Sequence, residues 1–367
     1  MSQRSSSGTA WWVGLCIALL VIATAGIAGA QTAKFDKRFN TSGNILISDQ
    51  YNNRVIEVDR ATHEVVWQFG DESSTAGPHS VVAPNDAQRI GPLTLISGTG
   101  APAGAEPTCP DGCPDNRVII VGPLGKILWQ YGETGVSGSD FNQLNAPVAA
   151  IFTPYSTVII TDQGNQRVIE VSLSKKILWQ YGTTGVGGSD ANQLNDPNSA
   201  ELLRNGHVLI ADEGNNRVIE VTRRNKIVWS YGDPNDTTIL NGPAFASRLS
   251  DGDTLISDAS NNRIVSVTPE GVVDFEYYTN GRPGSVADPI PTRAVRLENG
   301  NTLISDQYNH QVIEIDPNED VVFEQGEIGV SGDGFDMLNG PYDAKVIGDY
   351  TGLTPPFNQG SVFHHAL

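Results

Sequence analysis

The sequence predicts an all-β protein, a six-bladed β-propeller built of four-stranded antiparallel blades. Six copies of a proline followed three residues later by alanine recur at long intervals, at Pro84, Pro147, Pro197, Pro243, Pro291 and Pro341. The steps between these prolines are 63, 50, 46, 48 and 50 residues, which is the range of propeller-blade repeats. An aromatic residue also recurs at one place in the repeat, as Trp67, Trp129, Trp179, Trp229, Phe275 and Phe323. Six copies of the Pro-x-x-Ala segment and six copies of the aromatic residue predict six blades.

Each unit contains four short apolar runs, which are clearest in residues 197–232. In that copy the runs cover 198–203, 208–212, 217–221 and 226–231. Segments rich in Asn, Gly and Arg separate them, and such segments suit hairpin connections. Short runs rich in Val and Ile favour strands. The third run is apolar on both faces, so we expect its sheet to be covered on both sides, as stacked blades are.

An aspartate ends the second run and an arginine begins the third in most copies. The aspartates are Asp49, Asp162, Asp212, Asp258 and Asp306, and the arginines are Arg54, Arg117, Arg167, Arg217 and Arg263. A residue that nearly every repeat contains is most simply structural. We expect each aspartate to accept hydrogen bonds from the adjoining Asn turn and to pair with the nearby arginine; metal ligation is the alternative. The recurring aromatic residues are expected to pack blade against blade.

The C-terminal strand is expected to close the ring. The first strand that ends in aspartate, 44–49, has no Pro-x-x-Ala strand before it, and 341–347 has no strands after it. Joining the two completes the N-terminal blade and removes an open edge that would template aggregation. The propeller then spans 44–347, with 31–43 as a linker and 348–367 as a C-terminal tail that we expect to be loosely ordered.

The first 30 residues have the pattern of an export signal. Residues 5–33 carry no charge, and an apolar stretch over 11–27 leads into Ala28-Gly29-Ala30, the small-x-small pattern of a signal-peptidase site. An uncleaved anchor is the alternative, because about 20 apolar residues can span a bilayer. We therefore expect a secreted, periplasmic or cell-surface protein.

Cys109 and Cys113 are the only cysteines outside this apolar stretch. In an exported protein two neighbouring cysteines favour a disulfide. A metal site is the alternative, but it would need further thiolate or imidazole ligands nearby, and the sequence has none there.

The order of Pro-x-x-Ala, apolar-Asp, Asn-Asn-Arg-Val and a closing glycine resembles the NHL-repeat six-bladed β-propellers over roughly 44–347. The best match passes through Gly188-Ser189-Asp190, Pro197, Asp212, Asn216-Arg217-Val218 and Gly232. The resemblance implies the fold, and it allows an extracellular binding module, a scaffold or an enzyme. Some members of this family bind RNA through a basic face. Related six-bladed enzymes hold a divalent metal in the central channel.

The charge of the chain argues against nucleic acid and anionic membrane surfaces as partners. The formal net charge is −19, from 23 Lys and Arg against 42 Asp and Glu, so the RNA-binding activity of the family is not implied here. A membrane becomes a partner only if the N-terminal segment stays uncleaved.

Strand parity puts the longest loops on one face of the ring. The connections from a fourth strand to the next first strand, and from a second to a third strand, leave on the same side. Segments 132–146, 182–196 and 326–340 and the insertion 98–115 lie there; we call this side the long-loop face and the other the tight-turn face. Function concentrates in long loops on rigid scaffolds, so we expect a protein, small-molecule or carbohydrate ligand there, on a monomeric propeller.

The two residues inside each Pro-x-x-Ala vary most between repeats, and they lie at the channel mouth on the long-loop face. The candidate ligand-binding residues are the polar ones: Asn85, Asp86, Asn198, Ser199, Thr292, Arg293, Tyr342 and Asp343. Asp86 and Asp343 come from adjacent blades, and with Arg293 and Tyr342 they form the best candidate for a small ligand or a divalent cation, calcium or another metal. The alternative is that these side chains hydrate a water-filled channel.

These observations favour an exported NHL-like propeller that acts as a ligand-binding or protein-interaction scaffold through its long-loop face. The alternative is a metal-assisted hydrolase or lyase, of the lactonase-like or amidating-lyase kind, with its site at the channel mouth. The sequence contains no nucleophile elbow, His-Glu zinc motif or phosphate-binding loop, so an enzyme would depend on channel carboxylates.

Deleting the chain from Gly340 onward should lower the melting temperature of the whole domain, because it removes the strand that closes the ring. Thermal unfolding of the truncated and the full-length mature protein tests this. Equal melting temperatures would contradict closure by the C-terminal strand.

Overall fold

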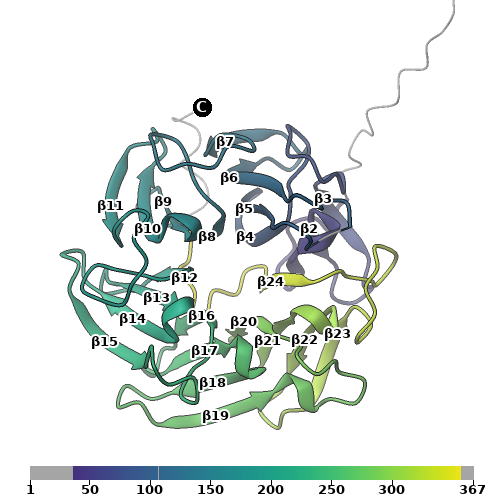
Figure 1. Cartoon of the computed structure of the whole chain (residues 1–367). Helices are drawn as coiled ribbons and strands as arrows, with labels where there is room; N and C mark the ends of the chain where they lie inside the picture. The colour runs from purple at the N-terminus through teal and green to yellow at the C-terminus, as the bar shows by residue number, and fades with distance from the viewer. Residues whose placement is uncertain (1–35, 106, 357–367) are drawn as a thin grey trace, which may run out of the picture. The chain divides into compact units, whose positions relative to one another are not determined.

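The computed structural model describes residues 36–105 and 107–356, and over these ranges the chain forms a ring of six four-stranded antiparallel sheets (Figure 1). The predicted all-β six-bladed propeller is confirmed. The expected signal segment, 1–30, and the first part of the linker lie outside the described residues. Helix in the described ranges is limited to six 3-10 turns, η1 to η6, and none of it is long and apolar enough to cross a bilayer.

Each blade is numbered by its place along the chain. Blade 1 consists of β24 (Pro341–Val346), β1 (Ile45–Asp49), β2 (Arg54–Val58) and β3 (Val65–Phe69). Blade 2 consists of β4 (Pro84–Ile90), β5 (Leu93–Ala101), β6 (Cys113–Val121) and β7 (Ile127–Tyr131). Blade 3 consists of β8 (Pro147–Phe152), β9 (Thr157–Asp162), β10 (Arg167–Ser172) and β11 (Ile177–Tyr181).

The other three blades repeat the pattern. Blade 4 consists of β12 (Pro197–Leu202), β13 (Val208–Asp212), β14 (Arg217–Val221) and β15 (Ile227–Gly232). Blade 5 consists of β16 (Pro243–Arg248), β17 (Thr254–Asp258), β18 (Arg263–Val267) and β19 (Val273–Tyr278). Blade 6 consists of β20 (Pro291–Arg296), β21 (Thr302–Asp306), β22 (Gln311–Ile315) and β23 (Val321–Gln325). The turns are η1 (Gln50–Asn52), η2 (Gln163–Asn165), η3 (Glu213–Asn215), η4 (Ala259–Asn261), η5 (Thr279–Gly281) and η6 (Gln307–Asn309).

The C-terminal strand completes the first blade, as predicted. β24 pairs antiparallel with β1, and Ala344 lies opposite Ile47. In all six inner strands the register skips the residue that follows the proline, so that Pro197 pairs with Asp212 but Ser199 pairs with Ala211. Such bulges re-aim side chains at the rim of a sheet. Here they lie at the channel mouth.

The hydrophobic core lies between neighbouring blades. Every residue of β14 is buried, and alternate residues face opposite neighbours. Ile219 belongs to a cluster shared with Ile159 of blade 3, whereas Val218 belongs to one shared with Ile256 of blade 5. The sheet is therefore covered on both sides, which explains why its third strand is apolar on both faces.

A buried carboxylate joins three chain segments at the long-loop end of blade 4. Oδ2 of Asp212 accepts hydrogen bonds from Nε of Arg217 at 2.7 Å and from Nδ2 of Asn215 at 2.8 Å. Its Oδ1 accepts the backbone N–H of Asn195, 2.8 Å away in the loop that enters β12. We call this arrangement the aspartate clasp. Asp49, Asp162 and Asp258 repeat it, which confirms the structural role predicted for these residues.

Blade 2 builds its clasp with a substitute. Gly98 stands where other blades have aspartate, and Asp115 supplies the carboxylate, pairing with Arg117 and accepting the N–H of Val82 at 2.8 Å. A Cβ on Gly98 would lie 2.6 Å from Cγ of Asp115, so only glycine leaves room for this carboxylate.

Blade 6 also departs from the pattern, because Gln311 replaces the arginine. Asp306 pairs instead with Arg282, 3.3 Å away in the segment after β19. Arg282 also donates to Oε1 of Gln311 at 2.6 Å. A guanidinium from outside the repeat thus supplies the missing positive charge.

The recurring aromatic residues pack between blades, as predicted. Nε1 of Trp129 donates to the carbonyl oxygen of Leu173 in the next blade at 2.8 Å. The guanidinium of Arg248, from blade 5, lies 4.7 Å from the ring centre of Trp229 in blade 4, a cation–π contact. These rings hold the blades together.

The insertion of blade 2 begins and ends in strand. β5 and β6 continue past the clasp, and Ala101 pairs with Cys113 near their far end. Cys109 and Cys113 form the predicted disulfide. Cys109 is buried and packs in a cluster with Val82, so the disulfide-bonded tip folds against the segment that enters β4.

The segment after β24 is not loose: residues 348–356 cross the central opening of the ring (Figure 1). The N–H and hydroxyl of Thr354 donate to Oε2 of Glu201 in blade 4, the former at 2.8 Å, and Nε2 of Gln88 in blade 2 donates to the carbonyl of Thr354 at 3.0 Å. Leu353 joins a buried core cluster. The expected loose tail is therefore wrong over 348–356, because these residues find partners on several blades; the rest of the tail lies outside the described residues.

Replacing Asp212 by Asn should lower the free energy of unfolding by about 3 kcal/mol, because Arg217 is left buried without its counter-ion. Urea denaturation measures this. The matched control Asp190→Asn, at an exposed carboxylate of a long loop, should change stability by less than about 0.5 kcal/mol. Equal stabilities of the two variants would refute the clasp.

Candidate functional site

The eight predicted mouth residues lie on inner strands, in two layers. Each inner strand starts at the long-loop face, so the residue after the proline lies nearer the surface than the next one. The outer layer holds Asn85, Asn198, Thr292 and Tyr342, and the deeper layer holds Asp86, Ser199, Arg293 and Asp343. Seven of the eight are buried, and Tyr342 is partly exposed.

The deeper layer contains an ion-pair cluster. Arg293 bridges two carboxylates: its Nη2 is 2.9 Å from Oδ1 of Asp86, and its Nε is 2.7 Å from Oδ1 of Asp343. Lys345 contacts both acids as well, pairing with Asp86 and lying 2.7 Å from Oδ2 of Asp343. We call these four residues the central cluster. It joins β4, β20 and β24 through two acids and two bases.

Backbone groups complete the coordination of the central cluster. Oδ2 of Asp86 accepts the N–H of Ala150 at 2.8 Å, and Oδ2 of Asp343 accepts the N–H of Ala87 at 3.0 Å. Burial alone would raise the pKa of Asp86, but the charges of Lys345 and Arg293 hold it below its usual range. Burial raises the pKa of Asp343 even though the same bases attract its charge. The protein thus supplies its own counter-ions here.

The two aspartates come together, but their surroundings do not fit a divalent cation. Arg293, Lys345 and two backbone N–H groups take the directions from which a metal would approach their oxygens. Among residues 36–105 and 107–356, no group of three or more His, Cys, Asp or Glu side chains could hold a metal ion. We therefore derive no chemistry through calcium or another metal at this site.

The channel is filled at the depth of the central cluster. The ring centre of Phe245 lies 4.0 Å from the guanidinium of Arg293, and the four members of the deeper layer are each less than 5% exposed. The hydroxyl of Ser199 has no hydrogen-bond partner in the part of the chain that the structure describes. Below this level the tail closes the opening through Thr354 and Glu201.

Amide side chains from three of the turns lie at the mouth above the central cluster. The first residues of the turns that follow the second strands lie there: Gln50, Gln163, Glu213, Ala259 and Gln307. Nε2 of Gln307 donates to Oε1 of Gln50 at 2.6 Å, and Nε2 of Gln50 donates to Oδ1 of Asn85 at 2.8 Å. Thr292 donates its hydroxyl to the carbonyl of Tyr342 at 2.6 Å. Asn85 and Thr292 of the outer layer are thus held by neutral groups.

Glu213 is the charged member of this rim. Nδ2 of Asn198 donates to its Oε2 at 2.7 Å and to the hydroxyl oxygen of Tyr342 at 2.7 Å. Burial raises the pKa of Glu213 to about 7, against the hydrogen bond from Asn198 and with a contribution from the charge of Asp196. Burial also raises the pKa of Tyr342. The mouth therefore holds a carboxyl group that changes charge near neutral pH beside a neutral phenol.

The long loops carry exposed apolar side chains on the same face. Phe141 is 74% exposed and Phe335 71% exposed, at equivalent places in the loops after β7 and β23. Three valines recur at another loop position and are 42–44% exposed: Val136, Val186 and Val330. The long loops thus present aromatic and aliphatic side chains to solvent at repeated positions.

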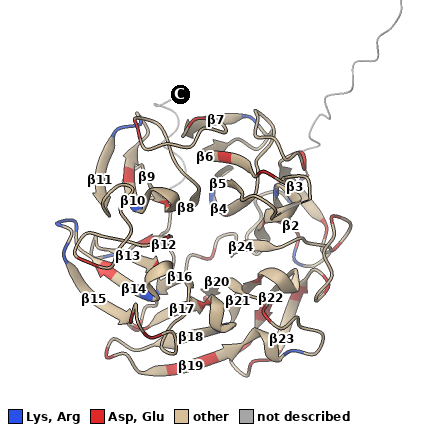
Figure 2. Cartoon of the chain, in the orientation of Figure 1, with Lys and Arg blue, Asp and Glu red and all other residues tan. Residues whose placement is uncertain are grey.

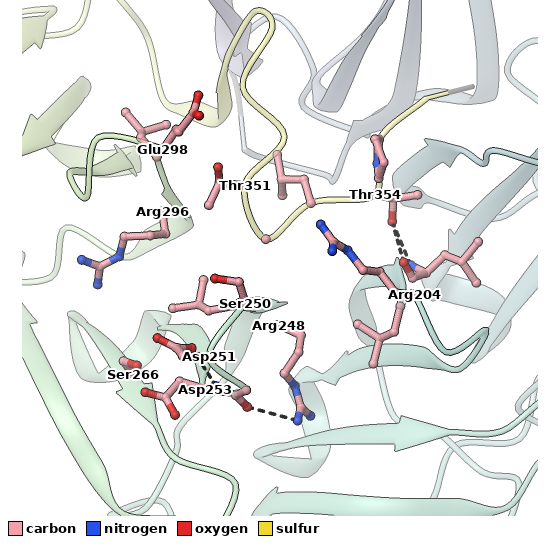
Figure 3. Close-up of a pocket in the computed structure, with 18 of the residues that line it drawn as sticks. Arg204, Arg248, Ser250, Asp251, Asp253, Ser266, Arg296, Glu298, Thr351 and Thr354 are labelled. Atoms are coloured by element: carbon pink, nitrogen blue, oxygen red, sulfur yellow. Dashed lines mark hydrogen bonds between the residues drawn. The ribbon is translucent and has the colours of Figure 1, made fainter. Parts of the chain in front are cut away.

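A cavity of about 1200 Å³ lies on the tight-turn face, between the tail and the turns of blades 3, 4, 5 and 6, with Tyr155 in its lining (Figure 3). Arg204, Arg248 and Arg296 line it together with acidic side chains, among them Asp251. Arg248 is already paired there, 3.1 Å from Glu220. Strand parity did not indicate this hollow, because the tail forms one of its walls.

Asp86, Asp343 and Arg293 lie together, as the sequence predicts, whereas Lys345 and Glu213 were not predicted to lie with them. Lys345 lies two residues after Asp343, so both side chains point to the same side of β24. Glu213 directly follows the aspartate of its clasp, a position that holds glutamine in three other blades. Comparing that position between repeats would have found it.

No protein-family model and no curated protein matches the chain. Among solved structures it resembles a protein of unknown function from Bacteroides caccae, with 16% identity and a TM-score of 0.56 over 77% of this chain and 93% of that one. A nidogen/laminin complex gives 11% identity and a TM-score of 0.51 over 77% and 92%. Virginiamycin B lyase from Staphylococcus aureus gives 13% identity and a TM-score of 0.48 over 79% and 86%. At these identities the likenesses show the fold alone.

Replacing Lys345 by Met should lower the free energy of unfolding by about 3 kcal/mol, because two buried carboxylates are left with one counter-ion. Urea denaturation compares it with Lys126→Met, which removes an exposed lysine and should have little effect. The wild-type melting temperature should not change with EDTA. Loss of stability on chelation would show that a metal belongs to the fold.

Proposed function

We propose that this chain is an exported, NHL-like β-propeller that binds a protein partner through its long-loop face. The single observation that carries this function is the pair of exposed phenylalanines, Phe141 and Phe335, at equivalent places in two long loops. Aromatic side chains are enriched where protein interfaces bury their energetic centres. In the part of the chain that the structure describes, most of the surface of both side chains is uncovered.

The scaffold beneath these loops is rigid. The aspartate clasp fixes the loop that enters an inner strand, through Asp212 and Asn195 for example, and Leu144, Leu194 and Leu338 anchor three long loops with side chains that are 0% exposed. Binding loops held on a fixed base lose little conformational entropy when a partner docks. The six-bladed ring thus supports a preformed surface.

A protein partner fits the surface better than the other classes considered. Asp and Glu recur around the ring and outnumber Lys and Arg (Figure 2), which disfavours nucleic acid. A metal-assisted hydrolase or lyase has no support from the channel, because Arg293 and Lys345 neutralise Asp86 and Asp343. A propeller fold also occurs in a nidogen/laminin complex, so the fold is compatible with protein recognition. A small molecule or carbohydrate is an outcome that the experiment below can reveal.

Export is part of the proposal. The Cys109–Cys113 disulfide suits an oxidising compartment, and the N-terminal sequence has the pattern of a signal segment. We propose a secreted, periplasmic or cell-surface protein that works as a single propeller.

Photo-crosslinking in the organism that makes the protein tests the binding face. A photoreactive phenylalanine analogue is placed at Phe141, at Phe335 and, as a matched control, at Tyr155, an aromatic residue that is 69% exposed on a tight turn of the opposite face. We expect one protein to be crosslinked from both loop positions and not from Tyr155. Crosslinking from Tyr155 alone, or adducts with a small molecule or carbohydrate only, would contradict the proposal.

The crosslinked partner is then purified and its affinity measured. Phe141→Ser and Phe335→Ser should each weaken binding about tenfold or more, as truncation of an interface anchor does, whereas Tyr155→Ser should leave the affinity unchanged. Affinities that are equal for all three variants would also contradict the proposal.

A further inference from the structure

The mouth contains an acid that the repeat does not require. Glu213 begins η3, and the equivalent residues of blades 1, 3 and 6 are Gln50, Gln163 and Gln307. The repeat therefore accommodates an uncharged amide side chain at this position in three blades. The negative charge of Glu213 needs another explanation than the fold.

Glu213 has hydrogen bonds but no counter-ion. Its Oε2 accepts from Nδ2 of Asn198 at 2.7 Å and from Nε2 of Gln163 at 3.3 Å. Its Oε1 accepts no hydrogen bond, and no Lys, Arg or His pairs with the carboxylate, within residues 36–105 and 107–356. The side chain is half-buried, so its charge is only partly hydrated. This contrasts with the clasp aspartate one residue earlier, which is paired with Arg217.

The neighbours of Glu213 suit a positive charge. On one side, the phenol of Tyr342 shares the amide of Asn198 with it, and a phenol ring can face a cation with its negative π surface. On the side of blade 5, the equivalent turn begins with Ala259, and Ala244 follows the proline of β16. A Cβ on Gly242 would lie 3.9 Å from Cγ of Glu213. Gly242 thus adjoins the carboxylate, and blade 5 has small residues at two positions where other blades place an amide.

We propose that the mouth binds a cationic nitrogen, the ammonium or guanidinium of a lysine or arginine side chain on the protein partner, with Glu213 as its ion-pair acceptor and Tyr342 against its apolar flank. That a protein partner carries the cation rests on the proposed function. The attraction of the mouth for a cationic nitrogen does not rest on it. A carboxylate with an open oxygen, whose other oxygen is held by the amides of Asn198 and Gln163, is a receptor for N–H donors.

The pH dependence of binding follows from the same neighbours. Burial raises the pKa of Glu213 to about 7, and Asp196, in the loop before β12, adds to the rise. Tyr342, from β24, stays neutral because burial raises its pKa, and the residues facing Glu213 from η2 and blade 5, Gln163 and Ala259, do not titrate. Only the ionised form pairs with a cation. The ionised fraction rises about tenfold from pH 6 to pH 8, and the affinity should rise with it.

Calorimetric titration of the full-length mature protein tests the site with defined probes. The probes are end-blocked Gly-Gly-Arg-Gly-Gly and Gly-Gly-Lys-Gly-Gly, the neutral control Gly-Gly-Gln-Gly-Gly, and n-butylammonium as a free amine. At pH 8 we expect the two basic peptides to bind at least tenfold more tightly than the glutamine peptide, and the lysine peptide to bind at least as tightly as n-butylammonium. Binding of the basic peptides should weaken about tenfold at pH 6.

Two variants distinguish binding at the mouth from nonspecific attraction to the negative charge of the protein. Glu213→Gln introduces the residue that three other blades have at this position, so the variant should fold normally. It should bind the basic peptides at least tenfold more weakly than wild type, and this binding should no longer depend on pH. Glu133→Gln removes an exposed acid from a long loop of the same face and should change neither. Equal binding to wild type and Glu213→Gln, no binding of either basic peptide at pH 8, or a preference for n-butylammonium would overturn the proposal.

The two proposals fail separately. A crosslinked partner whose affinity is the same for wild type and Glu213→Gln would leave the long-loop function standing and remove the cation site from it. Peptide binding that depends on Glu213, together with crosslinking only from Tyr155, would keep the cation site and remove the long-loop function.

Discussion

The buried aspartate clasp is the interaction on which the rest of the ring depends. One carboxylate, such as that of Asp212, holds the turn after a second strand, the arginine that begins the third, and the loop that enters the inner strand. Because that loop comes from the preceding blade, the clasp is also a contact between blades. Its cost is the burial of charge, which only complete pairing offsets. This explains why Gly98 is matched by Asp115 and why Gln311 is matched by Arg282: a clasp can change its residues but not its charge balance.

Repetition decided what could be predicted from the sequence. The strands, the closure of the ring, the role of the clasp aspartates and the Cys109–Cys113 disulfide all follow from patterns that recur or from local spacing. The tail over 348–356 was misjudged because its partners, such as Glu201, are distant in sequence and carry no repeat signal. At the centre, the meeting of Asp86 and Asp343 was predictable from blade order, but the presence of Lys345 between them turned a candidate metal site into a self-neutralised cluster. A single base, unremarkable in the sequence, changed the chemistry.

Two acids of the channel illustrate how surroundings assign roles to the same functional group. Asp86 lies deep in the channel, where two cationic side chains and a backbone N–H neutralise its charge. Glu213 lies nearer the surface with amide donors alone. The first stabilises the ring, while the second retains attraction for something outside it. Burial without a counter-ion costs stability, so an acid kept in that state is a residue for which a purpose outside folding is worth seeking.

Closure of blade 1 by β24 also determines when the protein can finish folding. β1 and β24 are hydrogen-bonded although almost the whole domain lies between them in the chain, and contacts of such sequence separation form late. The N-terminal part of the chain is synthesised first. Three strands of blade 1 are therefore present with an unpaired inner edge until β24 has been made. During that interval the edge of β1 is open to pairing with other chains. The rate at which the chain is synthesised, as well as the stability of the finished ring, therefore affects how long this edge stays open to aggregation.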